Sequence, residues 1–335
     1  MNTDAELWWG SIPGAQTIVR SISERMLQQT SLAVSATTGV HWPSILRMQV
    51  REQVQHRNAN LLIENCDDST MGDMSPGEWV LARYGSGIFR LPSISAEQTA
   101  LSNGLLQDRI FWVFGVQSKA RLKEWLDFAT LLQKNRNRRC GCVVILLDSN
   151  LTVKGRMEQL DINQYISEYD LAFFAATMVA SKALSFWEKK YLSNLAVCLS
   201  LGSPERCAEL IQNGRDLLAQ PEAVCGSNAD LLNAVWRGQL QTVFAQIEET
   251  KRTLVLRLAS HLKPILGTID DYGNRLISLD HIELRHIVHH LHKRITIPED
   301  DEAVVRSLYE MRNMLAHHRY LSYPQMLELF QLFGG

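Results

Sequence analysis

The residues best suited to chemistry lie close to the C-terminus, in the segment Met311-Arg-Asn-Met-Leu-Ala-His317. An arginine and a histidine are separated there by four residues. A histidine with a pKa of about 6.5 can transfer protons at neutral pH, and an arginine is a fixed fork of N–H donors for phosphate. The spacing therefore marks Arg312, Asn313 and His317 as candidate catalytic residues.

These residues are predicted to lie on a helix over 301–317, which follows Pro298 and is capped by Asp300 or Asp301. At roughly 100° per residue, Arg312 lies at the edge of the apolar stripe and His317 lies well round the cylinder from it. One helix cannot bring both side chains to one point, but two copies related by a two-fold axis could. The predicted stripe is Val304, Leu308, Met311 and Leu315.

Arg312-Asn-x-x-x-His317 on a late helix of a helical bundle resembles the HEPN domain over residues 230–335. In active members the domain dimerises and cleaves RNA without a metal. The resemblance implies that His317 is the general acid or base, that Arg312 stabilises the phosphorane charge and that Asn313 orients one of them. In many members the same segment is non-catalytic, and its Arg and His hold the helix to neighbouring loops. Both interpretations stay open.

A helix predicted at 280–294 is rich in histidine, with His286 and His290 at the i,i+4 spacing that suits two metal ligands. No acid or cysteine is clearly placed as a third ligand. We therefore expect no metal site, and a solvent-exposed face that becomes charged below about pH 6.5, with RNA contact as a further option. The five histidines are His281, His286, His289, His290 and His292.

The N-terminal half alternates buried apolar runs with helical patterns. Strands are predicted at 31–39, 61–65, 109–114 and 142–147, with short strands also indicated at 79–81 and 88–89. Continuous apolar strands that alternate with helices favour a parallel sheet covered on both faces. We expect an α/β N-terminal domain and an all-α C-terminal helical bundle.

This order of elements resembles the P-loop ATPases of the AAA+ and STAND groups over residues 10–220. The loop at the phosphate-binding position, 35–43, has one glycine and no lysine, although both are needed to hold phosphates. The strand 109–114 continues into Gly115 where a metal-holding acid is expected. We therefore expect a degenerate P-loop-like domain with no cofactor, and an active ATPase is the weakest hypothesis. The segment Asp148-Ser-Asn150 follows a predicted strand and matches the position at which these ATPases carry a polar residue that senses the phosphate.

Two further charged segments are predicted to be solvated loops. Asp67-Asp68 follows a strand and could hold a metal, but a polar turn is the simpler interpretation. The run 134–139 carries four positive charges and could contact a phosphate backbone.

The composition limits the function classes. The net charge of −2 gives no overall basic field, so nucleic-acid binding would need a local patch. Six cysteines without a C-x-x-C pair favour reduced, buried thiols in a cytoplasmic protein. No basic-then-apolar leader and no apolar run of about 20 residues is present, so we expect no secretion signal and no membrane span.

We predict a degenerate P-loop-like domain at 1–160, a helical lid at 161–220 and a HEPN-like domain at 230–335. The predicted function is that of a regulatory or scaffold protein in a prokaryotic multi-protein system, such as antiphage defence or a toxin–antitoxin pair. It would form a homodimer through its C-terminal helices or bind a protein partner. The alternative is a metal-independent endoribonuclease that uses Arg312 and His317 across a dimer interface, with RNA as its partner.

Overall fold

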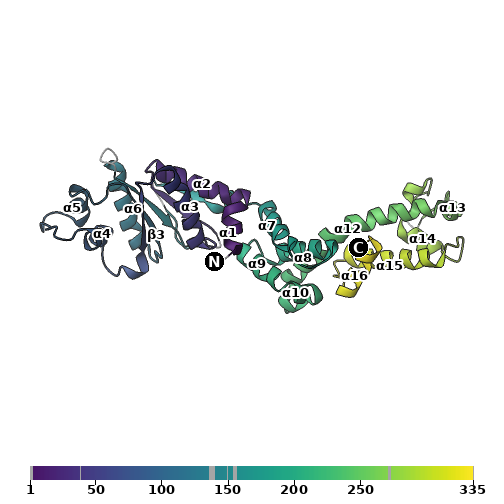
Figure 1. Ribbon diagram of the computed structural model, residues 1–335. Helices are drawn as coiled ribbons and strands as arrows, with labels where there is room; N and C mark the ends of the chain where they lie inside the picture. Colours follow the sequence, from purple (N-terminus) through teal and green to yellow (C-terminus); the bar gives the residue numbers. More distant parts are fainter. Residues whose placement is uncertain are drawn as a thin grey trace. The chain divides into compact units, whose positions relative to one another are not determined.

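A computed structural model describes residues 3–37, 39–135, 140–148, 150–153, 157–270 and 273–334. The chain forms two compact units, Met1–Leu171 and Ala172–Gly335. The predicted α/β and helical classes are confirmed (Figure 1). Helices α7 to α16 fall in the second unit apart from the first residues of α7, so the division into a lid and a C-terminal domain stays a prediction.

The first unit is built on a five-stranded, fully parallel sheet in the order β2-β3-β4-β1-β5. Leu32 of β1, which lies between β4 and β5, pairs with Val144 on one side and Glu158 on the other. The strands are β1 (Leu32–Ser35), β2 (Leu62–Asp67), β3 (Arg109–Phe114), β4 (Cys142–Leu146) and β5 (Glu158–Asp161).

Helices cover both faces of this sheet (Figure 1). On one face, Phe111 of β3 makes an edge contact with Phe128 of α6, with ring centroids 5.4 Å apart. Helices α2 and α3 lie on the other face and bury Ile18, Ile22 and Val50 completely. The helices of this unit are α1 (Thr3–Ser11), α2 (Pro13–Leu27), α3 (Pro43–Arg57), η1 (Asp68–Thr70), α4 (Pro76–Tyr84), α5 (Ala96–Ser102), α6 (Lys119–Lys134) and η3 (Ile162–Gln164).

The short strand indicated at 79–81 is wrong, because these residues lie inside α4. Ser75 accepts the N–H of Glu78, and the Glu78 carboxylate accepts the N–H of Ser75, which forms a capping box. Pro76 occupies the first turn, where its missing N–H costs nothing. The strand indicated at 88–89 is also absent from the described residues.

The second unit is arranged around the long helix α12 (Ala229–Arg257), which packs against α8 and α15. A Cβ at Gly238 would lie 3.1 Å from the Leu195 Cα, so the glycine allows the backbones of α12 and α8 to approach closely. The other helices are α7 (Glu168–Ala180), α8 (Phe186–Leu199), α9 (Pro204–Gln212), α10 (Gly214–Ala219), α11 (Pro221–Cys225), α13 (Ala259–Leu262), η4 (Lys263–Ile265), η5 (Leu279–His281), α14 (Leu284–His290), α15 (Glu299–Ala316) and α16 (Tyr323–Leu332).

Buried Gln239 ties the last segment of the chain to α12. Its side-chain oxygen accepts the N–H of Leu321 at 2.6 Å, and its amide nitrogen donates to the Leu321 carbonyl at 2.8 Å and to the Tyr191 hydroxyl at 3.0 Å. The side chain is 0% exposed and its polar groups are satisfied, which is the condition for burying an amide without penalty. None of the helices in the described ranges is long and apolar enough to cross a membrane.

Candidate functional site

The loop between β1 and α3 is the segment that the sequence pattern places at the position of a phosphate-binding loop. Helix α3 begins at Pro43, which has no N–H to offer, and Trp42 before it has a left-handed backbone (φ +43°). The Trp9 indole N–H donates to the His41 carbonyl at 3.0 Å and holds the loop to α1. Phosphate binding at a helix start depends on free N–H groups and a nearby cation. The described part of this loop supplies neither a lysine nor an arginine.

The ends of β2 and β3 meet at Asp67 and Gly115. The Asp67 carboxylate accepts the N–H of Ser69 at 3.1 Å and its hydroxyl at 2.5 Å. A Cβ at Gly115, which has φ +72°, would lie 2.9 Å from that carboxylate. The positive φ favours a glycine at this position, where P-loop ATPases carry an acid, and a side chain there would also crowd the Asp67 carboxylate.

Asp68 lies in a polar turn, as predicted, but it is buried, so the prediction that it is solvated is wrong. Its carboxylate accepts hydrogen bonds from the Arg121 guanidinium at 2.6 Å and from the Trp125 indole N–H at 2.8 Å. Its side chain is 4% exposed. These contacts tie η1 to α6, so the carboxylate holds two segments together and has little capacity left for a metal.

Arg312 of α15 is engaged by acids from neighbouring segments. Its Nε donates to Glu248 of α12 at 2.7 Å, and a terminal nitrogen lies 3.9 Å from Glu283. Lys251 of α12 lies 2.6 Å from Glu248 and 3.3 Å from Glu283. Burial alone would raise the pKa of the Glu248 carboxyl, but the hydrogen bonds from Arg312 and Lys251 bring that pKa below its ordinary value. We call these four residues the α12–α15 ion-pair network.

His317 forms the C-cap of α15 and is exposed. The helix ends in a Schellman motif: Arg319 N–H donates to Met314 O at 2.9 Å and His318 N–H donates to Leu315 O at 3.2 Å. His318 takes the left-handed position (φ +58°) and stacks on Trp236, with centroids 4.3 Å apart. The backbone N–H of His317 donates to the Asn313 carbonyl at 3.0 Å, and within the described ranges no side-chain contact joins His317 to Arg312 or to Asn313.

Helix α14 does not present the predicted solvent-exposed histidine face, because His286 is buried. Its Nδ1 accepts the N–H of Glu283 at 3.0 Å, and its Nε2 lies 3.6 Å from the Asp270 carboxylate. Burial, reinforced by the charge of Arg285, lowers the pKa of His286. His289 is exposed and His290 is half-buried. The described residues contain no group of three side chains placed to hold a metal.

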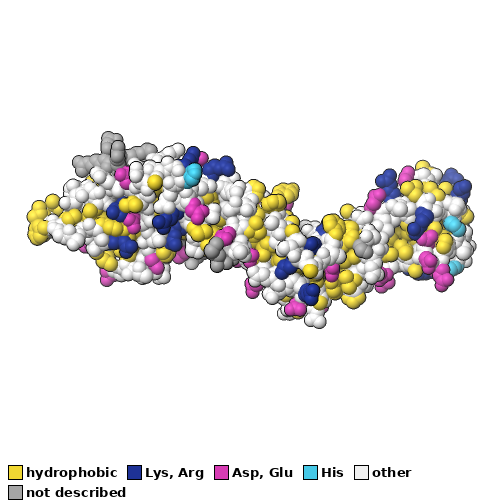
Figure 2. Space-filling view, viewed as in Figure 1, with side chains coloured by type: hydrophobic (Ala, Val, Ile, Leu, Met, Phe, Trp, Pro, Cys, Tyr) yellow, Lys and Arg dark blue, Asp and Glu magenta, His cyan; other side chains and the backbone are white. Residues whose placement is uncertain are grey.

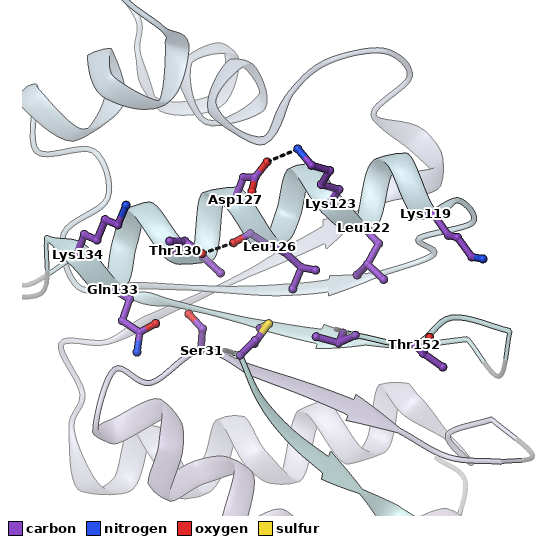
Figure 3. Close-up of a pocket in the computed structure, with 13 residues that line it drawn as sticks. Ser31, Lys119, Leu122, Lys123, Leu126, Asp127, Thr130, Gln133, Lys134 and Thr152 are labelled. Atoms are coloured by element: carbon purple, nitrogen blue, oxygen red, sulfur yellow. Dashed lines mark hydrogen bonds and ion pairs between the residues drawn. The ribbon is translucent and has the colours of Figure 1, made fainter. Parts of the chain in front are cut away.

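A groove beside α6, which the sequence did not predict, has a volume of about 1010 Å³ (Figure 3). Its floor is apolar, with Leu122, Leu126 and Val153, and Lys123 on its rim pairs with Asp127 at 3.0 Å. The connection from β4 to β5 contains no helix in its described residues, which leaves this face open beside α6. Of the predicted loop residues, 136–139 and Ser149 lie outside the described part of the chain.

The fold defines a class: an α/β unit with a five-stranded parallel sheet, followed by a helical unit. Among solved structures, the ORC2 protein of Aeropyrum pernix, in a structure titled as ADPNP-ADP complexes, is similar over 96% of this chain and 93% of that chain. The identity is 11% and the TM-score 0.36, a likeness too weak to carry a functional conclusion. No family model and no curated protein matches the chain.

Proposed function

We propose that this chain is a non-catalytic regulatory or scaffold protein, in which a P-loop-like unit without nucleotide chemistry is joined to a helical interaction unit. The observation that carries the proposal is the 2.7 Å contact between Arg312 and Glu248. An arginine that stabilises a phosphorane needs its donors directed at substrate, whereas this one is paired with an acid of the same unit.

The first unit supports the same conclusion. A phosphate at the start of α3 would meet Pro43, which has no N–H, and a loop that the Trp9 indole holds to α1. The described residues of that loop include no lysine. The carboxyl end of β3 offers Gly115 instead of an acid that could hold Mg²⁺. Binding of a nucleoside triphosphate in the usual P-loop manner would lack both its cation and its metal ligand.

The test is an RNA-cleavage assay on the full chain, together with calorimetric titration of ATP and ADP in the presence of Mg²⁺. The wild type, His317→Ala and Arg312→Ala should give the same background cleavage, and the nucleotides should give no binding heat. His318→Ala is a matched control, because it removes a neighbouring imidazole that stacks on Trp236. Cleavage that is lost in His317→Ala with the fold intact would establish the ribonuclease alternative instead.

A further inference from the structure

The described lining of one concavity in the helical unit holds several basic groups and no acid. The concavity has a volume of about 820 Å³ and lies between the turn after η4 and the end of α14. Its described lining consists of Pro264, Leu266, Gly267, Thr268, Ile269, Arg275, His289, His290, Lys293 and Arg294. Three permanent cations and two imidazoles therefore share one small surface.

The backbone of two turns places these groups. Gly267 N–H donates to Leu276 O at 2.7 Å and Leu276 N–H donates to Thr268 O at 2.9 Å, which closes a short hairpin that carries Arg275. At the end of α14, the His290 carbonyl accepts the N–H groups of Lys293, Arg294 and Ile295 at 3.0 to 3.2 Å. These bonds fold the chain back at the end of α14 and place Lys293 and Arg294 next to His290.

The cations are left without neutralising partners in the described residues. Arg275 donates to the Gly267 carbonyl at 3.2 Å, and within the described ranges none of Arg275, Lys293 and Arg294 forms an ion pair. Two of the four acids in the first turn of α15 pair with other cations: Glu302 with His292 and Arg306, and Asp301 with Arg257. The Asp270 carboxylate is 3% exposed and pairs with Arg285.

The cations and imidazoles of this concavity repel one another when they are charged. The pKa of His290 is lowered, and burial is the largest cause. The charges of neighbouring groups lower this pKa further, namely those of His289, Arg294, His286 and Lys293. Like charges held together without a compensating acid are destabilising, and a bound anion removes that repulsion. Figure 2 shows basic and histidine side chains at the end of the helical unit that contains α13 and α14.

We infer that this concavity binds the phosphodiester backbone of single-stranded nucleic acid through Arg275, Lys293 and Arg294, with His289 and His290 beside them. Apolar Pro264, Leu266 and exposed Ile269 line the same surface and suit an unstacked base or a sugar. A free inorganic anion or an acidic peptide would use the cations and leave this apolar part empty. The site is separate from Arg312 and the phosphate-loop position, so it goes beyond the proposed function.

The experiment measures fluorescence anisotropy of a labelled 12-nucleotide oligo-U RNA and its DNA equivalent on the full chain, at several salt concentrations. The variant Arg275→Gln/Lys293→Gln/Arg294→Gln should lose about tenfold or more in affinity. Its dependence on log salt should fall by about 2, since each phosphate contact of a single strand contributes about 0.7. The matched control, Arg20→Gln/Arg57→Gln/Lys119→Gln, removes three exposed cations of the first unit and should change affinity less than about twofold.

A second readout is the pH dependence of binding. A bound phosphate favours the charged imidazole, so binding takes up protons and affinity should rise as pH falls from 8 to 6. The groups that face His290 are His286 and His289 on α14, Lys293 and Arg294 on the following turn, and Arg275 on the hairpin. His289→Gln/His290→Gln should flatten the pH profile while binding at pH 8 is kept.

Three results would overturn the inference: no binding by the wild type, an equal loss in the site and control variants, or displacement of the RNA by polyglutamate at an equal concentration of charges. The last result would identify a general polyanion surface. None of these results depends on whether the chain cleaves RNA or holds a nucleotide, so the proposed function is tested separately.

Discussion

Two groups of charged residues in the helical unit differ in how their charges are balanced. In the α12–α15 ion-pair network, Arg312 and Lys251 share Glu248 and Glu283 at contacts of 2.6 to 3.9 Å. In the concavity at α14, the described lining gives Arg275, Lys293 and Arg294 no acid as a partner. The comparison teaches that residue type alone does not tell a basic side chain with a structural role from one that binds a ligand. What distinguishes the two is whether the fold places an acid beside the cation.

In the α/β unit, Arg121 pairs with Asp68, and this ion pair is more buried than the α12–α15 network. Its loss should therefore have the largest effect on stability. Asp68→Ala leaves Arg121 and the Trp125 indole without their buried acceptor. We expect the free energy of unfolding to fall by about 3 kcal/mol. Urea unfolding followed by circular dichroism measures it. Asp68→Asn is the control, because it keeps an acceptor for Trp125, and it should cost clearly less. A loss below about 1 kcal/mol for Asp68→Ala would show that the pair contributes little.

The α12–α15 network should give a smaller effect, because its side chains are about one-third exposed. Glu248→Ala removes the acid shared by Arg312 and Lys251, and we expect a loss of about 1 kcal/mol. Urea unfolding of both single variants and of Glu248→Ala/Arg312→Ala completes a double-mutant cycle, in which the losses should be less than additive. Additive losses would mean that Arg312 has its donors free, as the ribonuclease alternative requires.

These pairings explain which features could be predicted from the sequence. Strands β3 and β4 are continuous apolar runs that are buried on both faces, so 109–114 and 142–147 identify them well. Strand β5 has only Leu160 buried and shows no such run. The partners of Asp68 and Arg312 lie 53 and 64 residues away in the sequence. No local pattern contains that information, and the same is true of the contacts that bury His286.

His286 is a third case, because this buried histidine has both acids and a cation as neighbours. It lies near Asp270, Glu283 and Arg285. Its folded-state pKa is lowered, so the unfolded chain binds more protons as pH falls below the ordinary value of 6.5. The stability that the neutral ring contributes is present above pH 6.5 and is lost as pH falls toward the folded-state pKa. The urea midpoint should therefore decrease from pH 7.5 to 5.5, and His286→Asn, which keeps an acceptor for the Glu283 N–H, should decrease less. Equal slopes would assign the pH dependence to other groups.

The smallest effect on stability is expected from the cations of the concavity. Arg275→Gln/Lys293→Gln/Arg294→Gln removes three positive charges that repel one another and have no acidic partner among the described residues. Its free energy of unfolding should stay within about 0.5 kcal/mol of the wild type or rise slightly, in contrast to the loss expected for Glu248→Ala. Urea unfolding at low and at high salt checks this, because screening weakens the repulsion in the wild type and should reduce any gain of the variant. A loss above about 1 kcal/mol would show that these cations stabilise the folded chain themselves, and the contrast between the two regions would then disappear.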